Sequence, residues 1–440
     1  MSRPATQHKR AAYPVYKPSG IEWLGEIPEH WEVKRLKFVA NTVMGQSPNS
    51  DDYTFEESDR PFLQGNAEFG VENPTAKYYC ETATKTAPAG SLLVSVRAPV
   101  GALNIADRCY GIGRGLCAVI PDQGSLISRF AWHTLTVTRH ELWCIATGST
   151  YEAVSADEVA DMTVPISPLT EQRAIAAFLD RETARIDTLI EKKRRQIELL
   201  QEKRSALISH AVTKGLEPNA KIKDSGIEWL GEIPAHWEAI PLKRTFVILN
   251  GSTPKSSEPA YWDGGIPWAT PDDLGDLKGN TLETTRRMIT QEGYESCCTS
   301  LAPAGSLVLS TRAPIGHLAV AGISLCTNQG CRCLVFRNTD DHRFYYYQLL
   351  AAKGELESWG QGSTFKELGR DKLCAVRLLR PPSHEQRAIA AFLDRETAQI
   401  DALIEKVEKS IELLREYRTA LISAAVTGKI DVRREVHNAR

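Results

Sequence analysis

One short segment of the sequence resembles a catalytic motif. Pro271-Asp272 is followed by Asp276-Leu277-Lys278, and carboxylates beside a lysine are the residue types with which nucleases hold a divalent cation. The spacing is much shorter than such nucleases use, and the first half of the chain has no counterpart. A magnesium-dependent nuclease built on Asp272, Asp276 and Lys278 is therefore an alternative rather than the main interpretation.

Other catalytic signatures are missing. The sequence contains no GxxxxGK[ST] phosphate loop, no strand-linked GxGxxG and no Asn-Pro-Pro-aromatic tetrapeptide of amino methyltransferases. None of the ten cysteines forms a CxxC pair, so the spacing predicts no metal site and favours reduced, packed thiols. We expect no catalytic residue, no metal and no cofactor in this chain, and hence a recognition protein rather than an enzyme.

Composition agrees with a globular, multidomain protein. The 440 residues are 42% hydrophobic and 25% charged, with a net charge of −2. No apolar run reaches the roughly 18 residues of a membrane span, and the N-terminus lacks the apolar stretch of a signal peptide. We therefore expect a cytoplasmic protein without a membrane partner. The charge excludes a uniformly basic surface but not a local basic groove.

The chain contains a tandem duplication. The decapeptide SGIEWLGEIP begins at Ser19 and again at Ser225, and EQRAIAAFLDRETA begins at Glu171 and again at Glu385. The copies match again at Ala87–Gly101 and Ala302–Gly316, but the windows Leu36–Thr86 and Leu242–Leu301 share little, so a kept frame carries two different surfaces. That pattern indicates two similar modules that recognise different things.

Each repeat ends in a long predicted helix. The segment from Glu171 to about Thr213 has no glycine or proline, Thr170 is a candidate N-cap, and Gly215 closes it. Apolar residues recur at heptad spacing, which indicates a coiled coil about 60 Å long. Topology favours an antiparallel pair and approximate two-fold symmetry within one chain. The predicted seam consists of Ile186, Ile190, Ile197, Leu200 and Leu207 in the first helix, and of Ile400, Ile404, Val407, Ile411, Leu414 and Leu421 in the second, with Lys193, Arg204 and Arg418 as polar members.

The remainder of each copy predicts an α+β head with a mainly antiparallel or mixed sheet. Strands are expected at 91–96, 117–120, 306–311, 333–336 and 376–379, and helices at 129–142 and 343–356. The repeated leader tryptophans favour packing, whereas Trp262 and Trp268 are candidates for either ligand contact or the core. The predicted domains are recognition domain 1 (1–167), a central helix (168–215), recognition domain 2 (216–381), a C-terminal helix (382–430) and a tail (431–440).

These features resemble the specificity (S) subunit of type I restriction–modification enzymes. The resemblance rests on the leader G-I-x-W-L-G-x-I-P-x-H-W, the motif E-Q-R-A-I-A-x-F-L-D at Glu171 and Glu385, and the duplication, and it covers about Ser19 to Ile430. It implies two target-recognition domains, each reading one half of an asymmetric, bipartite site in double-stranded DNA. The helices would set the spacer and dock two methyltransferase (M) subunits, and two motor-nuclease (R) subunits would complete the complex. S-adenosylmethionine, ATP and Mg²⁺ would be used by those partners.

Residues that contact DNA are sought at matched positions. Arg97 and Arg312 share the repeat S-x-R-A-P-x-G, and because a repeated arginine cannot distinguish two half-sites, we predict phosphate contact; burial against a carboxylate is the alternative. Base readers are expected in the diverged windows. The candidates are Gln64, Asn66, Thr270 and Asp272, together with Asn328 and Gln329, which align with Gly113-Arg114. The turns at Ser149-Thr150 and Ser363-Thr364 are either backbone contacts or simple caps.

A different class of function is also compatible with the sequence. A bivalent DNA-binding or regulatory protein that works alone, without a methyltransferase, would show the same duplication and the same absence of catalytic motifs. It differs from a subunit in that the isolated chain would bind duplex DNA tightly at physiological salt.

Overall fold

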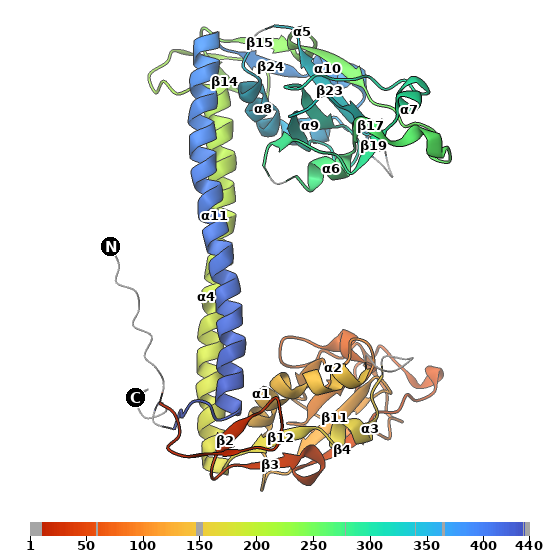
Figure 1. Cartoon of the computed structure of the whole chain (residues 1–440), viewed down its shortest axis with the longest axis vertical. Coiled ribbons are helices and arrows are strands. Elements are labelled where there is room, and N and C mark those ends of the chain that lie inside the picture. The colour runs from red at the N-terminus through yellow and green to blue at the C-terminus, as the bar shows by residue number, and fades with distance from the viewer. Residues whose placement is uncertain are drawn as a thin grey trace. The chain divides into compact units, whose positions relative to one another are not determined.

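The computed structural model describes residues 11–58, 60–146, 153–277, 279–338, 340–362, 366–433 and 435. The chain divides into two compact units: unit 1 comprises Met1–Lys193 and Lys409–Arg440, and unit 2 comprises Arg194–Glu408. Each unit holds one α+β head together with half of each long helix (Figure 1). We call the heads head 1 and head 2 and describe the units separately.

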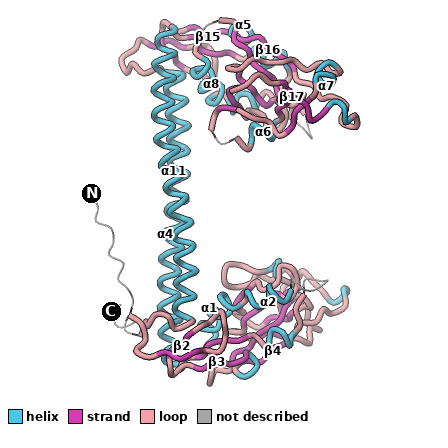
Figure 2. Tube along the Cα trace, in the orientation of Figure 1, coloured by secondary structure: helices cyan, strands magenta, loops and turns pink. Residues whose placement is uncertain are grey.

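Head 1 is built on two four-stranded sheets (Figure 2). The first is antiparallel, in the order β4 (Ala40–Met44), β11 (Leu116–Pro121), β8 (Leu92–Ser95) and β9 (Leu103–Ile105). The second is mixed, in the order β6 (Tyr78–Tyr79), β5 (Pro61–Leu63), β10 (Tyr110–Ile112) and β7 (Thr86–Ala87), and β5 runs parallel to β10. Two further antiparallel pairs are β1 (Tyr16–Pro18) with β2 (Glu26–Pro28), and β3 (Glu32–Arg35) with β12 (Thr163–Ile166). The helices are α1 (Ser128–Thr138), α2 (His140–Ala146) and α3 (Ala156–Ala160).

Head 2 repeats this plan in unit 2. Its main sheet has the order β16 (Phe246–Asn250), β23 (Cys331–Phe336), β20 (Leu307–Ser310), β21 (Leu318–Ala321) and β18 (Thr281–Leu282). The second sheet joins β19 (Arg287–Ile289), β17 (Trp262–Ala269) and β22 (Cys326–Thr327), with β17 parallel to β22. The outer pairs are β13 (Ile222–Asp224) with β14 (Glu232–Pro234), and β15 (Glu238–Pro241) with β24 (Arg377–Arg380). The helices are α5 (Leu242–Thr245), α6 (Pro271–Gly275), α7 (Gln291–Glu295), α8 (His342–Ala351), α9 (Lys353–Ser358) and α10 (Arg370–Ala375).

The predicted strands are present, but each predicted head helix is broken in two. The expected helix 129–142 forms as α1 and α2, because the ring Nδ1 of His140 lies 2.9 Å from the carbonyl oxygen of Val137, so that a side chain competes for a carbonyl of the ending helix. The expected helix 343–356 is α8 followed by α9, and the break falls at Ala352, whose backbone (φ −79°, ψ 2°) leaves the helical conformation.

The two long helices are α4 (Leu169–Lys214) and α11 (Ser383–Val426), with 46 and 44 residues. The first begins before Thr170, which therefore lies inside the helix and is not its N-cap, and it ends at Gly215, whose φ is 75°. Among the described residues, no helix combines the length and the apolar character needed to cross a membrane.

Within each unit the two helices run antiparallel and side by side (Figure 1). In unit 1, Asp187 of α4 pairs with Arg418 of α11 at 3.0 Å, while the start of α4 at Glu171 faces Arg433, beyond the end of α11. In unit 2, Arg204 pairs with Asp401 at 3.0 Å. Two of the three polar seam residues, Arg204 and Arg418, thus make ion pairs between the helices.

The heptad seam separates buried from exposed apolar positions. All the seam residues predicted from the spacing are buried or half-buried, whereas leucines off the seam are exposed. The contrast is sharpest between neighbours on α11, where the side chain of Ile411 is 5% exposed and that of Leu413 is 56% exposed. An α+β fold with two repeated heads and two long antiparallel helices is therefore confirmed.

A carboxylate at the start of each long helix holds the leader of the same unit, and it is buried in unit 1 and half-buried in unit 2. Glu171 accepts hydrogen bonds from the indole of Trp31 at 2.9 Å and from His30 at 2.7 Å, and its side chain is 8% exposed. Glu385 accepts the same two bonds from Trp237 and His236, at the same distances. Trp31 and Trp237 are themselves fully buried. Since a buried carboxylate without donors is costly, this pairing fixes the leader against the helix.

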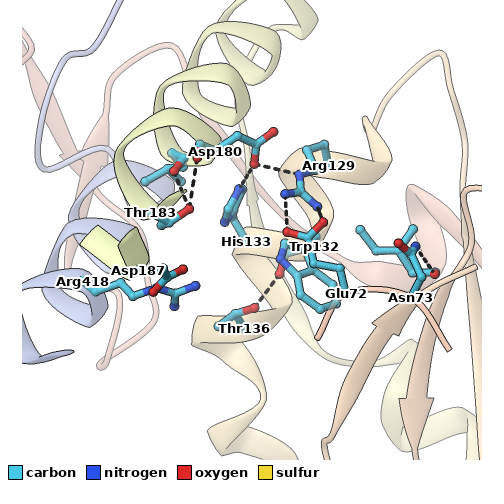
Figure 3. Close-up of polar contacts among 12 residues, drawn as sticks. Glu72, Asn73, Arg129, Trp132, His133, Thr136, Asp180, Thr183, Asp187 and Arg418 are labelled. Atoms are coloured by element: carbon cyan, nitrogen blue, oxygen red, sulfur yellow. Dashed lines mark hydrogen bonds and ion pairs between the residues drawn. The ribbon is translucent and has the colours of Figure 1, made fainter. Parts of the chain in front are cut away.

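Two more polar residues of the EQRAIAAFLD repeat hold the head itself. Gln172 accepts a bond from the backbone amide of Ile127 and donates to the carbonyl oxygens of Ser125 and Ser167, all within 2.9 Å. Asp180 accepts from Arg129 at 2.7 Å and from His133 at 2.8 Å, both on α1 (Figure 3). The repeat therefore serves to mount the head on its helix.

In unit 2 the same mounting uses one different hydrogen-bond donor. Asp394, the counterpart of Asp180, accepts from Arg343 at 3.0 Å and from the hydroxyl of Tyr347 at 2.8 Å. Tyr347 takes the place of His133, so the carboxylate is repeated although one of its donors has changed.

We predict that Ile411→Ala lowers the free energy of unfolding by about 2–3 kcal/mol, because it empties a buried seam position. Leu413→Ala, the matched control, should change it by no more than about 0.5 kcal/mol. Urea unfolding followed by helical circular dichroism measures both. Equal losses from the two variants would contradict the seam.

We also predict that the Asp180 carboxylate stabilises unit 1 in a pH-dependent way. Burial acts to raise the pKa of Asp180, but hydrogen bonds from His133 and Arg129 and their charge outweigh it, so the pKa lies below its ordinary value. The stabilisation is therefore complete above the unfolded pKa of about 3.9 and is lost as the pH falls through the folded value.

Asp180→Asn should accordingly lower the free energy of unfolding by about 1 kcal/mol at neutral pH, an effect reduced by the partial exposure of the carboxylate. The difference from the wild type should shrink below about pH 4. Urea titrations at several pH values test this, with Asp187→Asn, in an exposed ion pair, as the control. A loss that is independent of pH would contradict the assignment.

Candidate nucleic-acid interface

In each head, the ends of four strands meet at one edge of the sheets. In head 1 the amide of Gly113 donates to the carbonyl oxygen of Leu63 at 2.8 Å, and the amide of Val96 donates to that of Gly115 at 3.0 Å. The amide of Gln46 donates to the carbonyl oxygen of Ile112 at 2.9 Å. These bonds gather the segments that follow β4, β5, β8 and β10.

Glycine allows these segments to pack backbone against backbone. A Cβ atom on Gly45 would overlap the carbonyl of Gly113, and one on Gly251 would overlap the carbonyl of Asn328. The repeated Gly-x-x-Pro that begins at these glycines is thus a requirement of the close approach.

Head 1 carries a small hollow at this edge, and three of the predicted DNA-contacting residues line it. Gln64, Asn66 and Arg97 lie around a cavity of about 250 Å³, together with Arg114, Gly65 and Gly115. Gln64, Arg97 and Arg114 are exposed and Asn66 is half-buried. The hollow therefore presents two guanidinium groups and two amides, which are the groups that contact phosphates and read purine edges.

Arg114 is the residue that sequence reasoning did not select. It aligns with Gln329, which was a candidate, and this correspondence is the signal that would have identified it.

In head 2 the matched positions carry different chemistry. Thr270 and Asp272 replace Gln64 and Asn66, since Leu63 and Ala269 occupy equivalent places beside β10 and β22. The hydroxyl of Thr270 donates to Asp273 at 2.7 Å as part of the capping of α6, while Asp272 is exposed on that helix. Thr270 is thus engaged within the fold, and Asp272 is the more available of the two.

The remaining candidates of head 2 lie on the turn between β22 and β23. The side-chain oxygen of Asn328 accepts the amide of Gly330 at 2.9 Å and shapes this turn, and Gln329 is exposed and bonded to Thr253. Ser149, Thr150, Ser363 and Thr364 lie outside the described residues.

The two repeated arginines sit on closely similar loops. Ser95 and Ser310 each donate to the carbonyl oxygen of the loop proline, Pro99 or Pro314, and both Ala–Pro bonds are cis. The loop after each strand is therefore held by the same internal bonds.

The partners of these arginines differ. The backbone of Arg97 bridges Ala153, and that of Arg312 bridges Glu367 at the corresponding place. Arg312 donates to the Glu367 carboxylate at 3.0 Å, whereas no carboxylate pairs with the Arg97 side chain among the described residues. Arg97 is exposed at the edge, so the predicted alternative of burial against a carboxylate is wrong for this residue. Arg312 is half-buried and has its carboxylate partner, so the alternative holds in part there.

Other residues singled out in the sequence lie in the core or in ion pairs of the fold. Trp262 and Trp268 are buried against each other in head 2, which supports the core interpretation. Asp276 pairs with Arg286, and Lys278 lies outside the described residues. Within the described ranges, no three His, Cys, Asp or Glu side chains gather as a metal site would require.

Comparison with known families places this architecture. The model of the type I restriction modification DNA specificity domain matches residues 28–199 and 234–413, once for each repeat. Two specificity subunits of Methanocaldococcus jannaschii enzymes, MjaIX and putative MjaX, are 33% and 35% identical over 187 and 192 residues. These alignments cover 42% and 43% of this chain and 42% and 44% of the relatives, so the chain matches less than half of their length.

Solved structures share the fold over nearly the whole chain. A chain from a study of assembly and conformational transition of the type I R-M system superposes with a TM-score of 0.74 at 20% identity, covering 91% of this chain and 98% of that one. The HsdS subunit from Thermoanaerobacter tengcongensis gives a TM-score of 0.55 at 21% identity, with the same coverage. With both repeats matched by the family model, the chain belongs to the type I restriction modification DNA specificity domain family.

Proposed function

We propose that this chain is the non-catalytic DNA specificity subunit of a type I restriction–modification complex. The observation that carries the proposal is the pair of matched edges: one backbone frame presents Gln64, Asn66 and Arg114 in head 1, but Thr270, Asp272 and Gln329 in head 2. Each head would read one half of a bipartite DNA site through these residues. Arg97 and Arg312 would contact phosphates and position the head.

The long helices would set the spacer and dock two methyltransferase subunits. A 46-residue helix is about 69 Å long, which corresponds to roughly 20 base pairs of B-DNA and gives an upper limit for the separation. Two motor-nuclease subunits would complete the nuclease. Under this proposal the partner subunits use S-adenosylmethionine, ATP and Mg²⁺, and the complex works in the cytoplasm.

Arg97 gives the sharpest test of DNA contact. In a complex of this chain with its methyltransferase, Arg97→Ala should weaken DNA binding roughly tenfold and reduce the slope of log affinity against log salt by about 0.9. Arg97→Lys, the matched control, should keep the slope, because the charge is retained.

A second variant removes the contact without removing the arginine. Ala153→Glu places a carboxylate where head 2 has Glu367, so it should pair with Arg97 and weaken binding in the same direction. Fluorescence anisotropy over a salt series measures all three variants. Unchanged affinity and slope in Arg97→Ala would remove the phosphate contact from the proposal.

The function as a whole predicts a methylation pattern. In cells that co-express this chain with the neighbouring methyltransferase gene, adenine methylation mapped by single-molecule sequencing should fall on one interrupted motif and vanish when this chain is omitted.

The other outcomes of that experiment are informative. Methylation that does not depend on this chain would contradict the proposal. If no complex with the methyltransferase forms and the isolated chain binds duplex DNA tightly at physiological salt, a bivalent DNA-binding protein that works alone would replace it.

A further inference from the structure

The repeat makes it possible to compare the two places where a long helix ends against a leader. In unit 2, the last turns of α4, the connector to β13 and Phe392 of α11 surround a groove of about 660 Å³. We call it the connector groove; its lining residues include Leu207, His210, Lys214, Leu216, Ile222 and Phe392. Leu216 and Ile222 are about half exposed there.

At the corresponding corner of unit 1, two segments that are far apart in the sequence meet. Tyr13 and Val432 are buried, and Phe178, the counterpart of Phe392, is fully buried. The amide of Asp431 donates to the carbonyl oxygen of Ala11 at 2.7 Å, so the segment after α11 lies against the segment before β1. In unit 2 a single connector runs past this place, and Phe392 remains half-buried.

The buried carboxylate shows the same difference. Besides its bonds to the leader, Glu171 lies 3.4 Å from the guanidinium of Arg433 and accepts from the hydroxyl of Tyr13 at 3.3 Å. Glu385 receives the two leader bonds and has neither of these donors, and its side chain is 29% exposed against 8% for Glu171.

Glu385 lies near enough to the groove to contribute to it. It precedes Phe392 by seven residues, which is two helical turns, so the two share one face of α11 about 10 Å apart. A partly exposed carboxylate, which also has His384 at 3.9 Å, and the apolar groove therefore lie along one face of α11. In unit 1 the arginine that faces the equivalent carboxylate, Arg433, follows a buried aliphatic residue, Val432.

We propose that the connector groove binds a short extended segment of a partner protein, in which an apolar side chain is followed by arginine. The apolar side chain would cover Phe392, Leu207 and Leu216, and the arginine would pair with Glu385. This inference does not require the DNA-reading role of the heads, since it rests only on the difference between the two units.

The chain's own tail supplies the probe. A labelled peptide Lys-Ile-Asp-Val-Arg-Arg-Glu, with the sequence of residues 429–435, is titrated against the full-length chain by fluorescence anisotropy up to about 1 mM. We expect saturable binding at one site per chain. Replacing the first arginine of the peptide, which corresponds to Arg433, by alanine should weaken binding at least about tenfold.

Two variants of the chain locate the site. Glu385→Gln keeps an acceptor for Trp237 but removes the charge, and Leu216→Asp alters an exposed side chain that the fold does not require. Each should weaken peptide binding by about tenfold or more. Glu408→Gln, at an exposed carboxylate of the same helix, is the control and should bind as the wild type does.

Other results would overturn the proposal. These are a failure of the peptide to bind, binding unaffected by Glu385→Gln and Leu216→Asp, or binding lost in Glu171→Gln alone, which would place the peptide in unit 1. Concentration-dependent self-association that Leu216→Asp abolishes would assign the groove to a second copy of the chain instead.

Discussion

The structure of each unit depends on one carboxylate that the leader covers. Glu171 and Glu385 stand at the first turn of a long helix, and each is held by the indole and imidazole of the leader that precedes its own head. Because a carboxylate removed from water is stable only with its donors in place, the leader with its buried tryptophan and the helix start must form together. Asp180 and Asp394 then fix the head about two and a half turns further along. This explains why the sequence between these residues is repeated without change.

A head mounted in this way can change its exposed edge at little cost to the fold. The bonds that gather the strand ends are mostly backbone to backbone, and the close approaches involve glycine, so they do not depend on the side chains presented outward. The bridge between Arg97 and Ala153 recurs between Arg312 and Glu367, with the same backbone and a different charge balance. The frame therefore permits two edges of different chemistry in one protein.

The sequence could predict the features that depend on local residue spacing and on the internal repeat. The helices follow from heptad spacing, and the seam positions need no knowledge of the heads; the strands follow from short apolar runs next to turns. The breaks at His140 and Ala352 depend on a side chain and a backbone turn that compete with a weak helix, so the apolar pattern did not reveal them. The pairing of Arg312 with Glu367 joins residues 55 apart through an isolated bridge, and no periodic pattern marks such a contact. Burial of Trp262 against Trp268 was equally a matter of tertiary packing.

The duplication also explains where the two units must differ. At one junction the end of α4 runs covalently into the next leader, and at the other the segment after α11 lies against the segment before β1 without a covalent link. The second junction is held by Val432, Arg433 and Tyr13 in place of a peptide bond, and these side chains supply extra donors and apolar contact. The covalent junction in unit 2 lacks these side chains, so Glu385 stays 29% exposed and Phe392 lines the connector groove. The asymmetry of the surface is thus a consequence of chain connectivity, which makes the junction in unit 2 the place where a repeated fold has room for a partner.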